Sequence, residues 1–431
     1  MKRQTRFWLP AVSPALTGLP VMAGVVVFLA IACSDSQDRS DPPAGESSAQ
    51  AGVFADEPLE AFRGELLDLA FEAASALPVD PHIKNRSRAQ DAVVAACLEL
   101  GQPSRALGYI EKIDNWRRGS GYADLAFYCA RRGFTDKVRH YLDLARRIAE
   151  ESAREPNAQA WRSDRIKVKI ARTHALLGQD ADAARFEAGV VDSEKGKVNA
   201  VRAARLDADF FESEIEWIGS VVSKGNFENT GNALHVCAEL FNRFYDDDER
   251  RTLAEETIKS SWSKLPSLIR VELTMKLARF ALDHEDRAKA LALVEEAFQL
   301  IDSSNWSAEH SVPALARLAE IRFRAGEEAA ARNDAKRALA LFDRDRSKII
   351  NIYQAGALRP LAVLYQAMGD RPAALEIYSK ALEAGVENPN SRPRAEDLSA
   401  TCSSMAVHGV EPDAALKTRM LKIFNELGHP W

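Results

Sequence analysis

Residues 361–381 read LAVLYQAMGDRPAALEIYSKA, and this stretch decides the fold. Two small residues, Ala362 and Ala374, stand twelve positions apart, and Gly369 lies between them. The flanking apolar residues recur at three- and four-residue spacing, which is the period of a buried helix face. The pattern predicts two antiparallel helices joined by a short turn. The paired small residues let the helices approach closely, and the glycine ends the first helix with a positive φ.

The same spacing around a turn position recurs elsewhere in the chain. The other instances are Val94/Gly101/Ala106, Ala126/Gly133/Val138, Ala171/Gly178/Ala183, Ala278/Glu285/Ala290, Ala319/Gly326/Ala331 and Cys402/Gly409/Ala414. One hairpin cannot bury its apolar face alone, so consecutive hairpins must stack. We therefore expect residues 58–431 to form an all-α solenoid of about seven to nine antiparallel helix hairpins. Residues 190–260 fit this register worst, although a helix is expected at 233–244.

Residues 357–390 resemble the tetratricopeptide repeat. The family's signature positions are occupied by Leu361, Ala362, Tyr365, Ala374, Tyr378 and Ala381. The proline that often closes such a repeat is absent from its usual place, and the other hairpins match less closely. The resemblance implies a right-handed α-solenoid in which the first helix of each hairpin forms a concave wall. It also implies that a protein or peptide partner binds to this wall.

The N-terminus has the organisation of an export signal. Residues 1–6 are basic, residues 7–32 are uncharged, and residues 21–32 (VMAGVVVFLAIA) are strongly apolar. The run ends in LAIAC, which resembles the lipobox of bacterial lipoproteins, with Cys33 as the acylated residue. Ala30 stands where that family usually has Leu.

Three regions are therefore expected. The lipoprotein resemblance implies a signal peptide at 1–32, a composition rich in Ser, Asp, Pro, Gly and Ala predicts a flexible tether at 33–57, and the solenoid follows at 58–431. Ser34 rather than Asp follows the cysteine, which in that family implies the outer membrane, facing the periplasm. Two alternatives stay open. Residues 7–32 are long enough for an uncleaved anchor in the inner or cell membrane, although three prolines disfavour a regular helix there, and ordinary cleavage would release the chain.

The charge balance gives no indication of nucleic-acid binding. The full chain has a net charge of −6, and residues 1–32 contain three bases and no acid. The exported chain therefore carries 54 bases and 63 acids, a net charge of −9. Four of the five cysteines, Cys97, Cys129, Cys237 and Cys402, lie in apolar helical stretches and are expected to be buried free thiols rather than disulfides.

Motifs that would carry catalysis or bind a metal are weak or absent, so we expect no catalytic residue, no metal and no cofactor. Ser261 to Lys264 spells S-x-x-K, but the companion motifs of penicillin-binding enzymes are missing. The acidic residues 246–249 lack the spacing and the glycine of a calcium loop and are expected at a helix N-terminus instead. The eight histidines are dispersed.

Two features could mark a binding surface. Residues 112–172 contain fifteen bases and eight acids, and we treat eight of the bases as a possible surface for an acidic partner or a lipid phosphate: Arg117, Arg118, Arg131, Arg132, Arg146, Arg147, Lys167 and Lys169. Solvated helix backs are the alternative. Tryptophans precede several hairpins, at positions 116, 161, 262 and 306. They are expected to cover seams between hairpins, with sugar stacking as the alternative.

The sequence thus predicts a membrane-tethered, non-catalytic scaffold that binds a protein or peptide partner in the bacterial cell envelope. A glycan- or ligand-binding lipoprotein of an uptake or envelope-assembly system is the first alternative. An enzyme without a recognisable motif is the second.

Overall fold

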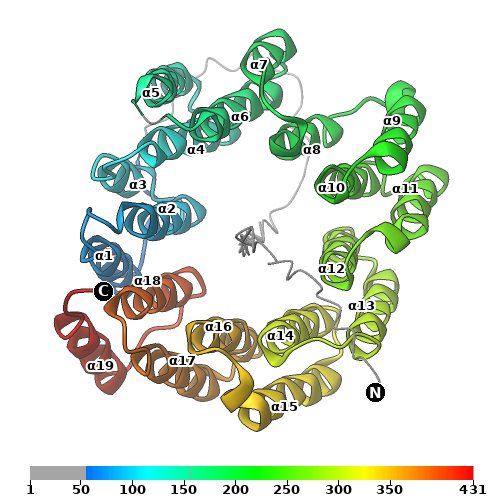
Figure 1. Ribbon diagram of the computed structural model, residues 1–431. Helices are drawn as coiled ribbons and strands as arrows, with labels where there is room; N and C mark the ends of the chain where they lie inside the picture. The colour runs from blue at the N-terminus through cyan, green and yellow to red at the C-terminus, as the bar shows by residue number, and fades with distance from the viewer. Residues whose placement is uncertain (1–54, 157, 431) are drawn as a thin grey trace, which may run out of the picture. The chain divides into compact units, whose positions relative to one another are not determined.

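The computed structural model describes residues 55–156 and 158–430, and these residues form nineteen α-helices, four short 3₁₀ helices and no strand. The signal peptide, Cys33 and most of the tether lie outside the described residues. Even-numbered helices form an inner layer and odd-numbered helices an outer layer (Figure 1). The chain is therefore a helical repeat protein with the solenoid architecture that the sequence predicts.

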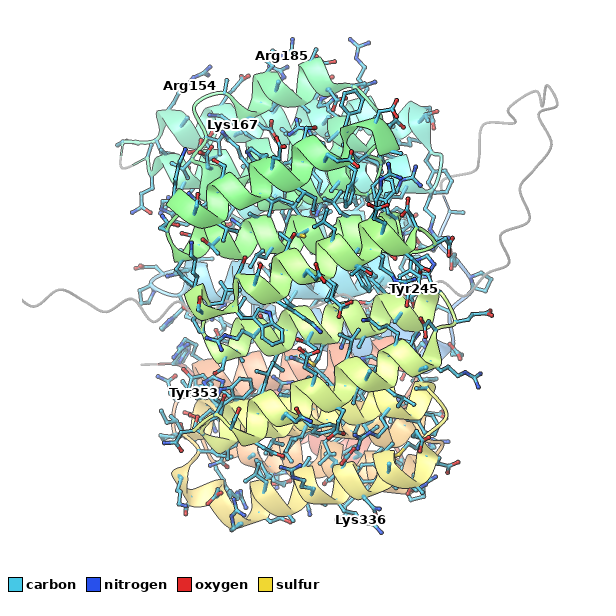
Figure 2. The ribbon with its side chains drawn as sticks, turned by 90° about the vertical axis from the view of Figure 1, so that its right-hand side faces the viewer. Arg154, Lys167, Arg185, Tyr245, Lys336 and Tyr353 are labelled. Carbon is cyan, nitrogen blue, oxygen red and sulfur yellow. The ribbon has the colours of Figure 1, made fainter. Side chains whose placement is uncertain are left out.

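The inner helices are α2 (Ile83–Glu99), α4 (Arg117–Arg131), α6 (Ala160–Leu176), α8 (Gly196–Ala203), α10 (Phe227–Arg243), α12 (Ser267–Asp283), α14 (Ala308–Arg324), α16 (Asn351–Ala367) and α18 (Ser391–Val407). The outer helices are α1 (Ala61–Ser75), α3 (Pro103–Ile110), α5 (Thr135–Arg154), α7 (Asp180–Glu187), α9 (Phe211–Lys224), α11 (Asp248–Ser260), α13 (Arg287–Asp302), α15 (Glu328–Asp345), α17 (Arg371–Val386) and α19 (Ala414–Asn425). The 3₁₀ helices are η1 (Asp192–Glu194), η2 (Ala208–Phe210), η3 (Trp262–Lys264) and η4 (Arg346–Lys348). Seen side-on, the helices run next to one another across the wall (Figure 2).

The turns between paired helices have the predicted backbone geometry. Gly369 has a φ of 74°, and the next amide, of Asp370, donates to the carbonyl of Tyr365 at 2.9 Å, which caps the end of α16. All seven predicted turn positions have positive φ. Glu285, the one non-glycine among them, has a φ of 61°, so the position fixes the backbone conformation even where its usual residue type is missing.

The paired small residues are buried at the helix contacts, as predicted, in six of the seven instances. Ala362 and Ala374, for example, are both completely inaccessible to solvent. The seventh instance is wrong as a hairpin, because Ala414 is exposed and α19 makes little contact with α18.

The helix that pairs with α18 is α1, from the other end of the chain. It packs along α18 as closely as α5 packs along α4, and its Leu67 and Ala70 are fully buried. Glu396 of α18 accepts hydrogen bonds from Asn85 at 2.8 Å and Arg88 at 2.9 Å, both on α2. The stack within residues 55–430 therefore closes into a ring (Figure 1), whereas the sequence pattern alone suggested an open rod or arc.

The region 190–260 departs from the regular repeat. Here α8 is short, η1 and η2 interrupt the chain, and α10 begins six residues before the helix expected at 233–244. A small separate core forms between α6, α7 and α8, from Val168, Ala171, Ala175, Ala183, Val190 and Val198. Short helices bury less apolar surface than full-length ones, which explains why the repeat pattern is faint here.

If the ring is closed through α1, a substitution in the buried face of α1 should lower the stability of the whole protein. We expect Leu67→Ala to lower the free energy of unfolding by about 2–5 kcal/mol, as for any fully buried leucine, because α1 fills the second-helix position of α18. Urea denaturation followed by circular dichroism measures it. Leu421→Ala on the exposed side of α19 is the control, with an expected change within about 0.5 kcal/mol. Equal, small effects for both variants would mean that α1 is only a loosely attached end.

Candidate functional site

The inner wall of the ring is formed by the first helix of each hairpin, and charged side chains connect neighbouring inner helices. Arg117 of α4 pairs with Asp91 of α2 at 2.9 Å, and Lys276 of α12 pairs with Glu239 of α10 at 2.8 Å. Lys197 of α8 interacts electrostatically with Asp91, although α4 and α6 separate their helices along the wall. Both side chains therefore project toward the interior of the ring.

One group of cations on this wall lies on α6 and α8, and we call Lys169, Arg172 and Lys197 the cationic arc. Asp124 of α4 accepts hydrogen bonds from Lys169 and, at 3.0 Å, from Arg172. The Arg172 guanidinium also lies over the ring of Phe127, 3.9 Å from its centroid. This stacking and the shared carboxylate hold the two α6 cations in fixed positions.

The electrostatics of the arc are dominated by positive charge. Burial alone would raise the pKa of Asp124, but Lys169 and Arg172 outweigh it and the pKa is lowered. The pKa of Lys197 is also lowered, first by the surrounding protein and then by Lys169 and Arg172. Repulsion of the charged form of a lysine by neighbouring cations indicates a local excess of positive potential.

The charge is not balanced within the arc. The two carboxylates in electrostatic range of Lys197 are Asp124, which is already paired with Lys169 and Arg172, and Asp91, which is already paired with Arg117. The helix α8 itself contains no acidic residue. On α12 and α14, by contrast, three arginines and three carboxylates lie in electrostatic contact with one another, and we call this group the balanced arc. It consists of Arg279, Arg317 and Arg324 with Glu272, Asp283 and Glu320. The sector at α6 and α8 thus has an excess of positive charge that the sector at α12 and α14 does not have.

The eight basic residues singled out from the sequence do not form one surface. Arg117, Arg118, Arg131 and Lys169 lie on the inner helices α4 and α6, as does Lys167, which pairs with Asp164 at 3.4 Å. Arg132 caps α4 and pairs with Glu57 at 3.2 Å, and Arg146 and Arg147 lie exposed on the outer helix α5. Only Lys169 belongs to the cationic arc, and a binding role for the other residues stays a prediction.

Sequence reasoning missed two members of the arc. Arg172 follows Lys169 by three positions, so the two share one helix face, and this spacing could have identified the pair. Lys197 could not have been found in this way. It belongs to the irregular region, and only the ring brings α8 beside α6.

The tryptophans cover seams between hairpins, as predicted. Trp116 is buried and contacts Trp161 of the next hairpin edge to face, with ring centroids 5.3 Å apart. Trp306 donates its indole N–H to the Ser267 hydroxyl at 2.7 Å, across the α12–α14 seam. Trp161 is the most exposed of these side chains, so it is the one to which the sugar-stacking alternative still applies.

The S-x-x-K stretch has structural hydrogen bonds. The Ser261 hydroxyl donates to the carbonyl of Thr257 at 2.8 Å, and the Lys264 ammonium donates to the carbonyl of Val222 at 2.7 Å. Asp247 of the acidic run accepts from the Arg250 amide at 3.1 Å and caps α11, the helix N-terminus that was expected. Both groups thus have partners within the fold.

The four cysteines outside the lipobox are buried free thiols, as predicted. Burial raises the pKa of Cys129 to about 12, so its thiol stays protonated and unreactive. Within the part of the chain that the structure describes, no cluster of His, Cys, Asp and Glu could hold a metal ion. In the same part, every helix is too short or too polar to cross a bilayer.

Comparisons with known proteins add little. No protein-family model and no curated protein matches the chain. Among solved structures it is similar to a circular tandem repeat protein with novel repeat topology and enhanced subunit contact surfaces. This similarity covers 85% of this chain and 94% of that one, with 15% identity and a TM-score of 0.25. These values are too low for any conclusion about this chain, so the closed ring rests on the chain's own helix contacts.

Asp124 should make stability depend on pH. Its folded-state pKa lies below the ordinary value of 3.8, so its charge stabilises the fold above that pH and the contribution is lost as pH falls through the folded value. At neutral pH we expect Asp124→Asn to destabilise the protein by about 1–3 kcal/mol, because Lys169 and Arg172 lose their acceptor. The difference should shrink below about pH 4.

Urea unfolding of both proteins across this pH range measures the effect. Asp182→Asn, which removes an exposed ion pair to Arg185 on the outer helix α7, is the matched control and should change little. A gap between wild type and Asp124→Asn that stays constant down to pH 3 would contradict the role given to Asp124.

Proposed function

We propose that this protein is a non-catalytic scaffold of the bacterial cell envelope that binds a protein or peptide partner on the inner wall of its ring. The observation that carries the proposal is the closed ring itself, whose inner wall combines ion-paired side chains with the cationic arc. A repeat wall built from the first helices of hairpins offers side chains from many helices to one partner. We further propose that the α16–α17 hairpin is of the tetratricopeptide type, on the residues at its signature positions.

Closure of the ring favours one kind of partner. Because α1 completes the α18 hairpin, the inner wall cannot be reached through a gap between the ends of the stack. A partner segment would enter along the ring axis, from one of the two faces where the hairpin turns lie. An extended chain or a single helix fits such an entry better than a second folded domain does.

Anchoring to the outer membrane, facing the periplasm, is part of the proposal and is supported by the sequence of residues 21–33. Acyl chains on Cys33 would contribute about 0.8 kcal/mol for each buried methylene, and more than one chain gives stable attachment. Residues 34–57 would then let the ring stand away from the bilayer.

The two alternative functions would each require a different kind of side chain on the inner wall. A glycan-binding lipoprotein would use exposed aromatic rings, and Trp161 is the seam tryptophan with the largest exposure, at 38%. An enzyme would bring together nucleophilic or acid–base groups. On the wall the prominent groups are instead cations and ion pairs, which favours binding over catalysis.

Site-specific photo-crosslinking in the native envelope tests the proposal. p-Benzoylphenylalanine would replace His235, beside Lys276 on the inner helices, or Arg154, which projects from the outside of the ring (Figure 2). We expect a reproducible protein adduct from position 235 and none from position 154. No adduct at 235, or the same adducts at both positions, would count against a partner inside the ring.

The anchor can be tested separately. We expect the wild-type chain to incorporate a fatty-acid label, lose residues 1–32 and fractionate with the outer membrane. In Cys33→Ser the label and the cleavage by a lipoprotein peptidase should both be lost, and mass spectrometry of the purified chain measures this. If the wild-type chain is unlabelled and stays in the membrane at its unprocessed mass, the anchor is the uncleaved N-terminal segment and not a lipid.

A further inference from the structure

We propose that the cationic arc is a binding site for an acidic peptide segment, whose side-chain carboxylates it pairs with. This inference rests on the proposed function, since it names the chemistry of the partner segment that enters the ring. It depends on three features of the arc: an unpaired cation, a preorganised arginine and a concave position.

The unpaired cation is Lys197. It is exposed to solvent and forms no ion pair with any residue that the structure describes. The pKa of Lys197 is lowered first by the surrounding protein, which displaces water, and then by the charges of Lys169 and Arg172, which repel its own. An incoming carboxylate would relieve this repulsion, so it would gain more from Lys197 than from an isolated surface lysine.

The preorganised arginine is Arg172. Its guanidinium lies over the ring of Phe127 and is hydrogen-bonded to Asp124. The side chain is still 17% exposed to solvent. Asp124 shows that a carboxylate fits between the two α6 cations at hydrogen-bonding distance. A guest carboxylate near Lys197 would meet two further cations, Lys169 and Arg172, whose side chains are already held in place, which favours binding.

The arc has a modest excess charge in a concave place. Three cations and one carboxylate leave two positive charges, which matches one or two peptide carboxylates. A flat bilayer surface cannot reach the inside of the ring, and the exported chain's net charge of −9 opposes approach of a long polyanion such as a nucleic acid. A thin peptide with one or two carboxylates can enter along the ring axis, and its small charge makes the repulsion by the rest of the chain weaker than for a long polyanion.

A comparison with the balanced arc shows what distinguishes the cationic arc. There Arg279 and Arg317 are also on inner helices, but Glu272 and Glu320 lie within electrostatic range of them. The arginines of that sector therefore have internal counter-charges. This makes Arg317 a matched control for Lys197, since each is an inner-wall cation with two carboxylates in electrostatic range. Those near Lys197, Asp124 and Asp91, are already ion-paired with other cations. Those near Arg317, Glu272 and Glu320, form no ion pair with another described residue.

Fluorescence anisotropy with the lipidated full chain in detergent tests the inference. The probe is a short peptide of alternating Glu and Gly with a neutral fluorophore, and the same peptide with Gln for Glu is its uncharged counterpart. We expect the Glu peptide to bind more tightly, and added salt to weaken it. Lys197→Gln should weaken the Glu peptide about three- to fivefold, as for loss of one solvent-accessible ion pair, and Lys197→Glu should weaken it further.

Two control variants show whether the loss of peptide affinity is specific to Lys197. Arg317→Gln on the balanced arc and Arg154→Gln on the outside should each change the affinity by less than about twofold. Equal binding of the Glu and Gln peptides, or equal effects of Lys197→Gln and Arg154→Gln, would overturn the inference. Tripolyphosphate that binds through Lys197 more tightly than the Glu peptide would overturn the peptide assignment in favour of a phosphate ligand.

The same variant separates this inference from the proposed function. If the crosslinked adduct at position 235 persists in Lys197→Gln with unchanged yield, the partner binds inside the ring without using the arc, and only the further inference fails. If wild type gives no adduct at 235 while the Glu peptide still binds through Lys197, the arc is real and the scaffold proposal fails.

Discussion

The close pairing of α18 with α1 is the contact on which the arrangement of the other helices depends. Each hairpin buries small residues where its two helices cross, and a stack of such hairpins has two ends with unburied apolar faces. Here the first helix of the chain covers the last inner helix, with Leu67 and Ala70 fully buried at the contact. The apolar faces at both ends are satisfied by each other, and no terminal capping repeat is needed between them.

Closure also fixes the spacing of the charges on the inner wall. An open solenoid can flex and change the distance between side chains on different repeats. In a ring, each inner helix has an inner neighbour on both sides, so the separation of Asp124, Arg172 and Lys197 is set by the packing of α4, α6 and α8. The pKa of Lys197 is accordingly lowered by Lys169 and Arg172, in addition to the larger effect of the surrounding protein, which removes water from its ammonium group.

Much of the fold could be predicted because it is local. The positions Gly369 and Ala374 lie close to Ala362 in the sequence, and the steric rule that links them needs no information about distant parts of the chain. The rule even identified Glu285, where the residue type differs but the φ does not. It failed at Ala414, because the choice between α19 and α1 as the partner of α18 is a contact between the two ends of the chain.

The candidate site was harder to predict for the same reason. The excess of bases in residues 112–172 was visible in the sequence, but a helix distributes them around its surface, and the structure divides them between inner and outer layers. What makes a site is the convergence of Lys197 with Lys169 and Arg172, and only the path of the chain through the irregular region 190–260 brings α8 beside α6. Charge composition therefore drew attention to a segment that contributes Lys169 and Arg172 to the cationic arc, whereas ring geometry decides which cations face one another. Because Asp124 and Phe127 hold Lys169 and Arg172 in place before any ligand arrives, a carboxylate bound at the arc would have to order only the side chain of Lys197.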